Sequence, residues 1–335
     1  MENSRQGYAT YRKVKVPLRI LLAAALAVSF AESSGAAPRK AHKTFRSAPQ
    51  GADSVFVAQS RYRRSPYVGA ISVDAATGRI LFASNIDTPA YPASVPKLMT
   101  AFLVLDDIKA GRLSLTDQVV ASPTKTKRDV HLRQPSAIGL KPGQSVSVDA
   151  MLKAIMVKSA NDAAVFLAEK CSGSMEAFVA RMNDKARSLG MTSTRFYNPN
   201  GLPPCKRSET DNFNVSTCRD LAVMARALIR THPEILKYTS LKVCQLELPM
   251  QGAVRFVNHN NVMVKDKLKV INPDGSEATD GLKTGYIDAG GSSVVITGKR
   301  GGKRAIVVVL GSNSAAERDD AARQKLGDAL DALSF

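Results

Sequence analysis

Ser94 and Lys97 stand three residues apart in the stretch YPASVPKLMT, at the start of an apolar run with helical spacing. On a helix of about 3.6 residues per turn the two side chains lie on one face, so the lysine amine can approach the serine hydroxyl. A serine hydroxyl needs such a base to become a nucleophile, and a lysine can be that base when it is neutral. The pair therefore predicts nucleophilic catalysis through Ser94.

Two further short motifs follow the pair in the chain. The first is SAN, Ser159–Asn161, and the second is KTG, Lys283–Gly285. Spacing alone is weak support, because Ser122 and Lys125 have the same separation in a polar loop with no helix behind it. The order of the three motifs, with a helix start at the first, makes the combination specific.

Penicillin-binding proteins and class A β-lactamases share a closely similar trio, S-x-x-K with S-D-N and K-T-G. Among them the chain resembles the D-alanyl-D-alanine carboxypeptidases of the low-molecular-mass penicillin-binding proteins. The likeness runs from about residue 67 to the end of the chain and includes PASVPKLMTAFLVL, LKPGQSVSVDAMLKAIMVKSANDAAVFLAE, FYNPNGLP and DGLKTGYIDAGG. It implies a serine peptidase that removes the terminal D-alanine from peptidoglycan stem peptides and that β-lactams acylate.

The resemblance implies a catalytic group of four residues. Ser94 would attack the peptide carbonyl, and Lys97 would take the serine proton. Ser159 would relay a proton between Lys97 and the departing amine, and Asn161 would hold the substrate amide and Lys97 in place. An unperturbed lysine has a pKa of about 10.4, so the pKa of Lys97 has to fall by about 3 units for its amine to be neutral near pH 7. Burial and the nearby cation Lys283 are predicted to supply that shift.

The resemblance also implies a substrate-binding group on the third motif. Lys283 and Thr284 would bind the free carboxylate of the terminal residue. Gly285 would let the peptide lie close to the strand edge and pair with it. The backbone amides of Ser94 and Tyr286 would form the oxyanion hole.

The chain departs from its relatives at three places. They usually carry other residues at Val95-Pro96, and often a histidine where this chain has Tyr286, while Pro204–Phe213 resembles an insertion. The sequence therefore defines the preferred substrate less closely than it defines the reaction. A DD-endopeptidase that cuts peptide crosslinks stays an alternative, because it differs only in what it admits beside Lys283.

Two other readings are weaker. A class A β-lactamase needs a glutamate that directs the deacylating water, commonly in E-x-x-L-N, and no such pattern lies between Asn161 and Lys283. A non-catalytic wall-binding protein would carry the serine and both lysines for no chemical reason. Rapid turnover of penicillin would favour the β-lactamase.

The elements that must position the motifs are predicted as strands at both ends of the folded part and helices between them. Strand-like runs joined by turn residues predict one hairpin over residues 67–74 and 79–85, and another over 292–300 and 303–311 around Gly301-Gly302. Helical spacing occurs at 94–105, 147–158, 161–171, 175–190, 217–232 and 316–333.

This order of elements predicts an α+β fold. We expect an antiparallel sheet of about five strands flanked by helices, with an inserted, mainly helical lobe. The resemblance implies the same fold, shared by DD-peptidases and β-lactamases. Pro96 fits the first turn of a helix that begins near Ser94, because the missing N–H has no partner there anyway. Thr217 and Asp220 have the capping-box arrangement at another helix start.

The N-terminus has the pattern of an export signal. Basic residues between Arg12 and Arg19 precede the apolar run ILLAAALAVSFA, and small residues follow, with cleavage expected after Ala31 or Ala36. An uncleaved anchor is the alternative, although the run is shorter than the roughly 20 residues of a spanning helix. We therefore expect a signal peptide over 1–36, a linker over 37–65 and a catalytic domain over 66–335, without a C-terminal β-rich domain. The protein would act in the periplasm or at the outer face of the cytoplasmic membrane.

The chain of 335 residues carries a formal net charge of +18, which is partly concentrated in one segment. Residues 37–65 contain seven Lys or Arg against Asp53 alone. Outside the cell such a basic segment would contact anionic lipid headgroups or wall polymers, or serve only as a solvated leader. Export and the lack of a recognition motif argue against nucleic acid, and we expect a monomer.

The four cysteines, Cys171, Cys205, Cys218 and Cys244, would meet an oxidising compartment after export. Three pairings are possible for two bridges. Cys205 and Cys218 bracket a polar, turn-rich segment, which favours a local bridge between them. No C-x-x-C pair is present and the four histidines are scattered, so neither a metal nor a cofactor is expected.

Overall fold

The computed structural model of the protein describes residues 67–123, 136–203 and 212–334. They belong to the unit Ala48–Phe335, the second of two units into which the chain divides. The expected signal peptide and basic linker lie outside the described residues. Within the described ranges, no helix combines the length and apolarity that a membrane span requires.

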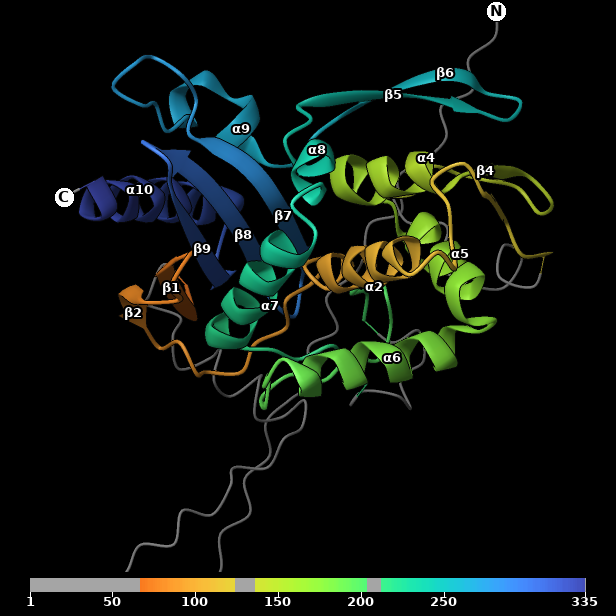
Figure 1. Ribbon diagram of the computed structural model, residues 1–335, viewed down its shortest axis with the longest axis horizontal. Coiled ribbons are helices and arrows are strands. Elements are labelled where there is room, and N and C mark those ends of the chain that lie inside the picture. The colour runs from red at the N-terminus through yellow and green to blue at the C-terminus, as the bar shows by residue number, and fades with distance from the viewer. Residues whose placement is uncertain (1–66, 124–135, 204–211, 335) are drawn as a thin grey trace, which may run out of the picture. The chain divides into compact units, whose positions relative to one another are not determined.

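Five antiparallel strands form the main sheet, in the order β2-β1-β9-β8-β7 (Figure 1). The first hairpin joins the last one, because β1 pairs with β2 on one side and with β9 on the other. The sheet and both predicted hairpins are thereby confirmed, and with the helices around them so is the α+β class. The strands are β1 (Gly69–Asp74), β2 (Ile80–Ser84), β7 (Thr279–Ile287), β8 (Gly291–Arg300) and β9 (Lys303–Ser312).

Helices cover both faces of this sheet: α2 (Lys97–Lys109) and α7 (Cys218–Thr231) on one face, and α10 (Ala315–Ser334) on the other. Side chains alternate between the faces of a strand. On β9, Val307 belongs to the apolar cluster of α10, whereas Val308 belongs to the larger cluster that contains α2 and α7. This alternation explains why β9 is an almost uninterrupted apolar run.

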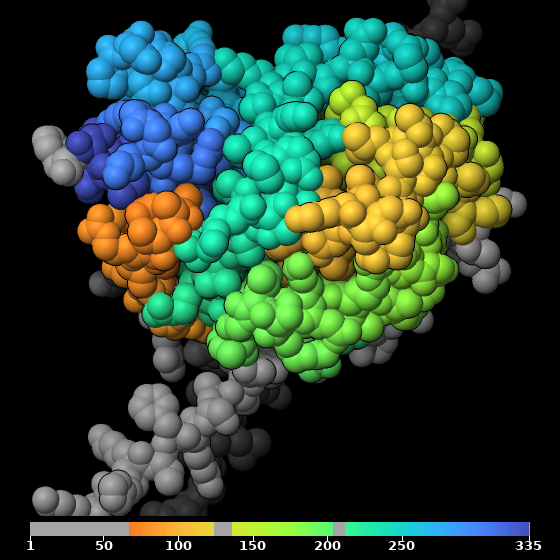
Figure 2. All heavy atoms as spheres, viewed as in Figure 1, coloured from red at the N-terminus to blue at the C-terminus, as the bar shows by residue number. Residues whose placement is uncertain are grey.

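A helical lobe is inserted between β2 and α7, as the sequence predicts. Helix α2 is the centre of this lobe, and most of its residues are buried. It packs against α5 and α6 as well as α7, and α7 fills the space between sheet and lobe in the space-filling view (Figure 2). The other helices of the lobe are α4 (Val148–Lys153), the π-helical η2 (Ala154–Lys158), α5 (Asn161–Ser172) and α6 (Met175–Ser188).

Several small elements go beyond the sequence prediction. Two two-stranded sheets pair β3 with β4 and β5 with β6. The β5–β6 hairpin contacts η2 through β6, so it adds a wall beside the second motif (Figure 1). These elements are β3 (Gln118–Val120), β4 (Ser145–Ser147), α8 (Ile235–Thr239), β5 (Val243–Leu248), β6 (Gly252–Val257), α9 (Asn261–Val264) and η4 (Asp266–Leu268).

Two helix starts can be compared with the prediction. Thr217 caps α7, because its side chain accepts a hydrogen bond from Asp220 N. Asp220 does not complete a capping box, since its carboxylate accepts from Ser193 N and from the Thr194 hydroxyl instead. Helix α2 begins at Lys97, later than expected, and its first turn is preceded by a separate turn.

The predicted bridge between Cys205 and Cys218 is wrong. Cys218 is a free thiol and is buried in the first turn of α7. Its sulfur faces β1, where a β-carbon at Gly69 would lie 3.2 Å from Sγ. Packing against this strand, rather than the turn-rich segment, decides where the side chain points. Cys171 and Cys244 are free thiols too, and Cys205 lies outside the described residues.

Candidate active site

Ser94 lies in the turn that leads into α2, and Lys97 is the first residue of that helix. Backbone hydrogen bonds close the turn, from Val95 N to Pro92 O and from Lys97 N to Ser94 O. Ala93 has a φ of 52°, a strained value for a residue with a side chain. The result is a distance of 3.0 Å between Lys97 Nζ and Ser94 Oγ.

Two more oxygen atoms hold the amine of Lys97. Nζ lies 2.7 Å from Asn161 Oδ1 and 2.6 Å from Asn200 O. The sequence predicts the first contact but not the second, because a backbone carbonyl has no residue type of its own. The stretch FYNPNGLP was the only available signal, and it marks likeness without marking a role.

The surroundings favour the neutral form of Lys97. Complete burial and then the charge of Lys283 lower the pKa of Lys97 well below its ordinary value, while Asp162 acts in the opposite direction. These are the two causes that the sequence predicts. A neutral amine has a lone pair, so Lys97 is positioned to accept the proton of the Ser94 hydroxyl.

The SAN motif lies where η2 ends and α5 begins. Ser159 has φ 61° and ψ 32°, and this left-handed conformation stops the helix and redirects the chain. Asn161 then starts α5 with its amide nitrogen donating to Ser136 O at 2.7 Å. Both side chains are buried. Among the described residues the Ser159 hydroxyl makes no hydrogen bond, so Asn161 alone links this motif to Lys97 directly.

Asp162 fixes the motif to the segment before β4. Its carboxylate accepts hydrogen bonds from Ile138 N and Gly139 N, and also from Ala163 N at the start of its own helix. Burial raises the pKa of Asp162, and the backbone N–H groups oppose that rise. Asp162 is not among the site residues that the sequence predicts. Its place directly after Asn161, in the first turn of a buried helix, was the available signal.

Lys283 and Thr284 lie on β7, the edge strand of the main sheet, which pairs with β8 among the described strands. The side chain of Lys283 is 2% exposed. Burial, followed by the charge of Arg318, lowers the pKa of Lys283 to about 7. Its Nζ donates to Thr284 O at 2.9 Å. Among the described residues no carboxylate pairs with Lys283, so its ammonium form could hold an anion.

Two glycines allow the motifs to meet backbone against backbone. A β-carbon at Gly285 would lie 2.6 Å from Pro92 O and 2.8 Å from Ser94 N. A β-carbon at Gly201 would lie 1.7 Å from Ala93 O, which leaves room only for hydrogen. The turn that carries Ser94 is thus clamped between β7 and the segment that supplies the Asn200 carbonyl.

Tyr286 differs from the other predicted site residues, because its side chain is 62% exposed. Its hydroxyl donates to Asp288 Oδ1 at 2.8 Å, away from the buried lysines. Only its backbone is positioned beside the Ser94 turn, through its neighbour Gly285. The three motifs are therefore brought together as predicted, with the Tyr286 ring outside the buried cluster. In the described ranges, no three or more His, Cys, Asp or Glu side chains form a group that could hold a metal ion.

Comparison with known proteins agrees with this geometry. A family profile described as D-alanyl-D-alanine carboxypeptidase matches residues 66–314. The chain is 33% identical over 272 residues to D-alanyl-D-alanine carboxypeptidase DacF of Bacillus subtilis, covering 80% of this chain and 64% of that protein. It is 34% identical over 245 residues to DacC of Escherichia coli, covering 73% of this chain and 56% of that protein. The chain thus spans less than two thirds of the length of these relatives.

Solved structures of penicillin-binding proteins also match the fold of this chain. Penicillin binding protein 6B of Escherichia coli superposes with a TM-score of 0.65 at 32% identity, covering 78% of this chain and 76% of that one. Penicillin-binding protein D2 of Listeria monocytogenes, in an ampicillin-bound form, superposes with a TM-score of 0.64 at 30% identity, covering 78% and 97%. The fold, the motif geometry and these matches together show that the chain belongs to the D-alanyl-D-alanine carboxypeptidase family.

Proposed function

We propose that the protein is a serine-type D-Ala-D-Ala carboxypeptidase that removes the terminal D-alanine from peptidoglycan stem peptides through an acyl-enzyme on Ser94. The observation that carries this proposal is the 3.0 Å distance between Ser94 Oγ and the buried amine of Lys97. A second buried lysine, Lys283, lies on β7 and is suited to bind a carboxylate. An exopeptidase needs both features, a nucleophile and a cation for the free chain end.

Acylation begins when neutral Lys97 accepts the proton of Ser94. The serine oxygen attacks the carbonyl carbon of the penultimate residue, and negative charge develops on the carbonyl oxygen. The backbone N–H groups of Ser94 and Tyr286 stabilise this charge, a contribution of roughly 10² to 10³ in rate for one such donor. The close contact between Gly285 and the Ser94 amide supports this pairing of donors.

The remaining residues of the motifs hold the substrate and move the proton. Lys283 and Thr284 bind the terminal carboxylate, and Asn161 holds both the peptide amide and the Lys97 amine. Ser159 passes the proton to the departing amine of D-alanine. Water then cleaves the ester, which frees the shortened peptide and restores Ser94.

The names of the relatives support this activity, and the ampicillin-bound structure from Listeria monocytogenes supports β-lactams as covalent inhibitors. The proposal includes export, because the substrate is a wall polymer that lies outside the cytoplasm. Residues 1–36 would serve as the signal peptide and 37–65 as a linker that contacts anionic membrane or wall polymers. Residues 66–335 would form the catalytic domain and act as a monomer in the periplasm or at the outer face of the cytoplasmic membrane.

The test is incubation with a labelled penicillin followed by mass spectrometry of the intact protein. Wild type is expected to gain one adduct, and Ser94→Ala is expected to gain none. Ser122→Ala is the matched control, because Ser122 has the same spacing to a lysine, and it should gain the adduct at the wild-type rate. An adduct that persists in Ser94→Ala overturns Ser94 as the nucleophile.

A second measurement fixes the reaction. Release of D-alanine from an acyl-D-Ala-D-Ala peptide is expected from wild type and not from Ser94→Ala. The penicillin adduct should decay slowly, over many minutes, as in a carboxypeptidase that β-lactams inhibit. Rapid hydrolysis of penicillin, with no release of D-alanine, would instead identify a β-lactamase.

A further inference from the structure

The amine of Lys97 has a hydrogen-bond partner that none of the three motifs supplies. Its Nζ lies 3.0 Å from Ser94 Oγ, 2.7 Å from Asn161 Oδ1 and 2.6 Å from Asn200 O. Asn200 lies in the loop 197–202, and its contribution is a backbone carbonyl. The shortest of the three contacts therefore comes from a loop that has no part in the chemistry above.

The donors and acceptors around the amine show what this carbonyl does. A neutral amine has two N–H groups and one lone pair. The amide oxygen of Asn161 and the backbone oxygen of Asn200 can only accept hydrogen bonds, so they take the two N–H groups. The lone pair then faces the Ser94 hydroxyl, which can donate. Without the Asn200 carbonyl, the amine could rotate and turn an N–H group toward Ser94 instead.

The same carbonyl acts again after the proton has moved. When Lys97 takes the proton, the O–H bond of Ser94 breaks and a third N–H bond forms on the amine. The ammonium then has three N–H groups and faces three oxygen atoms, those of Ser94, Asn161 and Asn200. Hydrogen bonds to a charged group are the strong ones, so the Asn200 carbonyl also stabilises the product of the proton transfer.

Thr100 fixes this carbonyl from α2. Its hydroxyl donates to Pro199 O at 2.7 Å, and Pro199 directly precedes Asn200. Thr100 follows Lys97 by three residues, so the two side chains lie on one face of the helix. Two successive carbonyls of the loop thus meet two successive positions on that face. Thr100 is completely buried, so solvent does not compete for its hydrogen bond.

Two asparagines hold the loop on either side of Asn200 in the chain. Asn214 Oδ1 accepts from Tyr197 N at 2.6 Å and from Asn198 N at 3.1 Å. Asn214 Nδ2 also donates to Asn198 O at 3.0 Å. The Asn198 side chain continues the network, because its Oδ1 accepts from Gly201 N at 2.6 Å. The buried Asn214 therefore anchors the start of the loop, and Asn198 ties that start to Gly201.

We propose that Thr100 and Asn214 are positioning residues for the catalytic base. They hold the Asn200 carbonyl at the Lys97 amine, and this carbonyl directs the lone pair of the base toward Ser94. The inference rests on the proposed function, in which Lys97 takes the serine proton. Neither residue belongs to the three motifs, and both act through the loop 197–202.

The pH profile of acylation separates this role from a simple loss of packing. Its acid limb is the range in which the rate falls as Lys97 gains a proton. A carbonyl that accepts from an ammonium favours the charged form, so loss of this contact lowers the pKa of Lys97 further. A general loosening would instead admit water and relieve the burial that lowers the pKa of Lys97. The two causes therefore move the acid limb in opposite directions.

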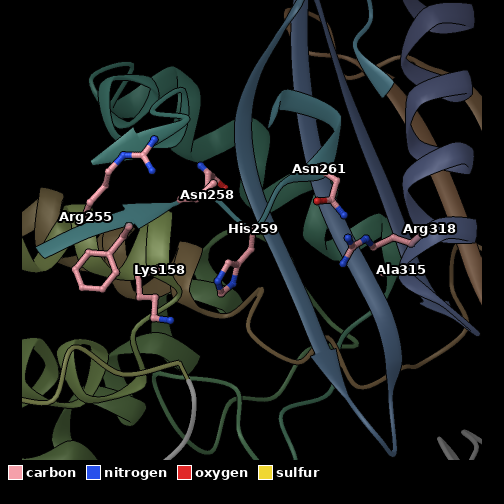
Figure 3. Close-up of a pocket in the computed structure, with 9 residues that line it drawn as sticks. Lys158, Arg255, Asn258, His259, Asn261, Ala315 and Arg318 are labelled. Carbon is pink, nitrogen blue, oxygen red and sulfur yellow. The ribbon is translucent and has the colours of Figure 1, made fainter. Parts of the chain in front are cut away.

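The charged groups around Lys97 remain the same in every variant compared. Lys283 on β7 lowers the pKa of Lys97, and Asp162 on α5 raises it. Figure 3 shows two further groups, His259 and Lys158, which line one pocket. Burial and the charges of nearby lysines lower the pKa of His259 to about 4. His259 is therefore neutral above about pH 5 and adds no limb to the profile at higher pH.

Thr100→Val is the main variant, because it replaces the hydroxyl with a methyl group of similar size. Thr297→Val is the matched control, since Thr297 is also completely buried and donates to a carbonyl, Ala305 O, at 2.8 Å. Thr297 lies on β8 opposite Gly281. Four residues of β7 separate Gly281 from Gly285, the contact of Ser94, and they span about 13 Å.

Two more variants guard against misfolding as the cause. Thr100→Ser keeps the hydroxyl and should retain the wild-type profile. Asn214→Ala removes the second anchor of the loop and should act in the same way as Thr100→Val. Urea unfolding of each variant shows that the protein is folded in the assay.

The measurement is the first-order acylation step at saturating labelled penicillin, from pH 5 to 10. Thr100→Val should lower the plateau rate about tenfold, because a base that is out of line loses part of its catalytic contribution. Its acid limb should move to lower pH, whereas Thr297→Val should keep the wild-type plateau and limb.

The outcomes distinguish this inference from the proposed function. A wild type that acylates, with a Thr100→Val plateau equal to it, overturns this inference alone. An acid limb that stays in place or moves to higher pH in Thr100→Val overturns it as well. A wild type that gains no penicillin adduct overturns the proposed function and this inference together.

Discussion

The amide nitrogen of Ser94 lies directly against Gly285, so closely that a β-carbon at position 285 would stand 2.8 Å from it. This contact joins a strand of the main sheet to the turn before α2, and the two are 191 residues apart in the chain. It also brings together the two backbone N–H groups proposed for the oxyanion hole. The geometry of the nucleophile therefore depends on the absence of one methyl group.

Replacing Gly285 with alanine is expected to slow acylation by a labelled penicillin by about 100-fold. The added carbon forces Pro92 or Ser94 to move, and a displacement of about 1 Å at a reacting group costs a factor of that order. The measurement is the second-order rate constant of adduct formation, with a thermal melt to show that the protein is folded.

Gly327→Ala is the matched control for this substitution. Gly327 lies inside α10, and a β-carbon there would meet no atom within 4 Å. Its replacement should leave acylation unchanged and raise stability by about 0.5 to 1 kcal/mol, because glycine is a poor helix residue. Equal acylation rates for Gly285→Ala and Gly327→Ala would contradict the role of the contact.

The pH dependence of acylation is expected to follow the ionisation of Lys97. The rate should fall as pH drops through the lowered pKa of Lys97, because protonation removes the base. Burial and the charge of Lys283 both lower that pKa, so Lys283→Met should raise it and move the acid limb to higher pH. The measurement is the first-order acylation step at saturating penicillin from pH 5 to 10. Lys109→Met should leave the pH midpoint of the acid limb unchanged. An unchanged midpoint in Lys283→Met would refute the coupling between Lys283 and Lys97.

Lys283 should also lower the stability of the folded protein. Its pKa falls from 10.5 to about 7 on folding, so between those values the unfolded chain binds a proton that the folded protein releases. Stability contributed by this group therefore rises from pH 7 to 10.5 and is lowest below pH 7. A shift of this size corresponds to roughly 5 kcal/mol at its limit.

Lys283→Met is accordingly expected to be more stable than wild type by roughly 2 to 5 kcal/mol at pH 6, although it binds carboxylates less well. The gain should shrink as pH approaches 10.5. Urea unfolding at pH 6, 8 and 10 measures it, with Lys109→Met as the exposed counterpart. A constant difference across this range would show that packing, rather than ionisation, separates the two proteins.

Asp162→Asn is expected to destabilise the protein by about 2 to 3 kcal/mol. The carboxylate accepts from Ile138 N and Gly139 N in a buried site, and an amide would turn a donor toward one of these donors. Acylation should slow as well, because Asn161 is the adjacent residue. Asp184→Asn, which removes an exposed ion pair with Arg187, should cost less than about 0.5 kcal/mol. Similar unfolding midpoints for the two variants would refute the anchoring role.

The sequence predicted most of the cluster because its chemistry depends on residue types. A nucleophile, a base and a cation must be Ser94, Lys97 and Lys283 or their equivalents, and each sits at a recognisable helix start or strand. The main sheet was predictable for a similar reason. The strand-like apolar runs of the two hairpins and the Gly301-Gly302 turn leave few other arrangements.

The parts that the sequence did not predict depend on distance rather than on type. The Asn200 carbonyl holds Lys97, but any residue has a carbonyl, and only the close packing of Gly201 on Ala93 brings this one within reach. The pocket lined by Lys158, Arg255 and Arg318 also depends on distance rather than on residue type. Lys158 and Arg255 are far apart in the chain and meet only because β6 packs on η2.

The free thiol of Cys218 is another feature that depends on packing rather than on residue type, and it can be tested directly. The turn-rich segment after Cys205 favoured a local bridge, whereas the structure buries Cys218 against β1 as a free thiol. Burial also raises its pKa far above the ordinary value, so it should resist alkylation in the native protein. After denaturation without reductant, iodoacetamide followed by peptide mass spectrometry should find Cys218 fully alkylated. Burial raises the pKa of the Cys171 thiol to about 12, so Cys171 is the internal control for alkylation after denaturation only. A peptide that links Cys218 to Cys205 would show that the bridge forms and that α7 begins differently.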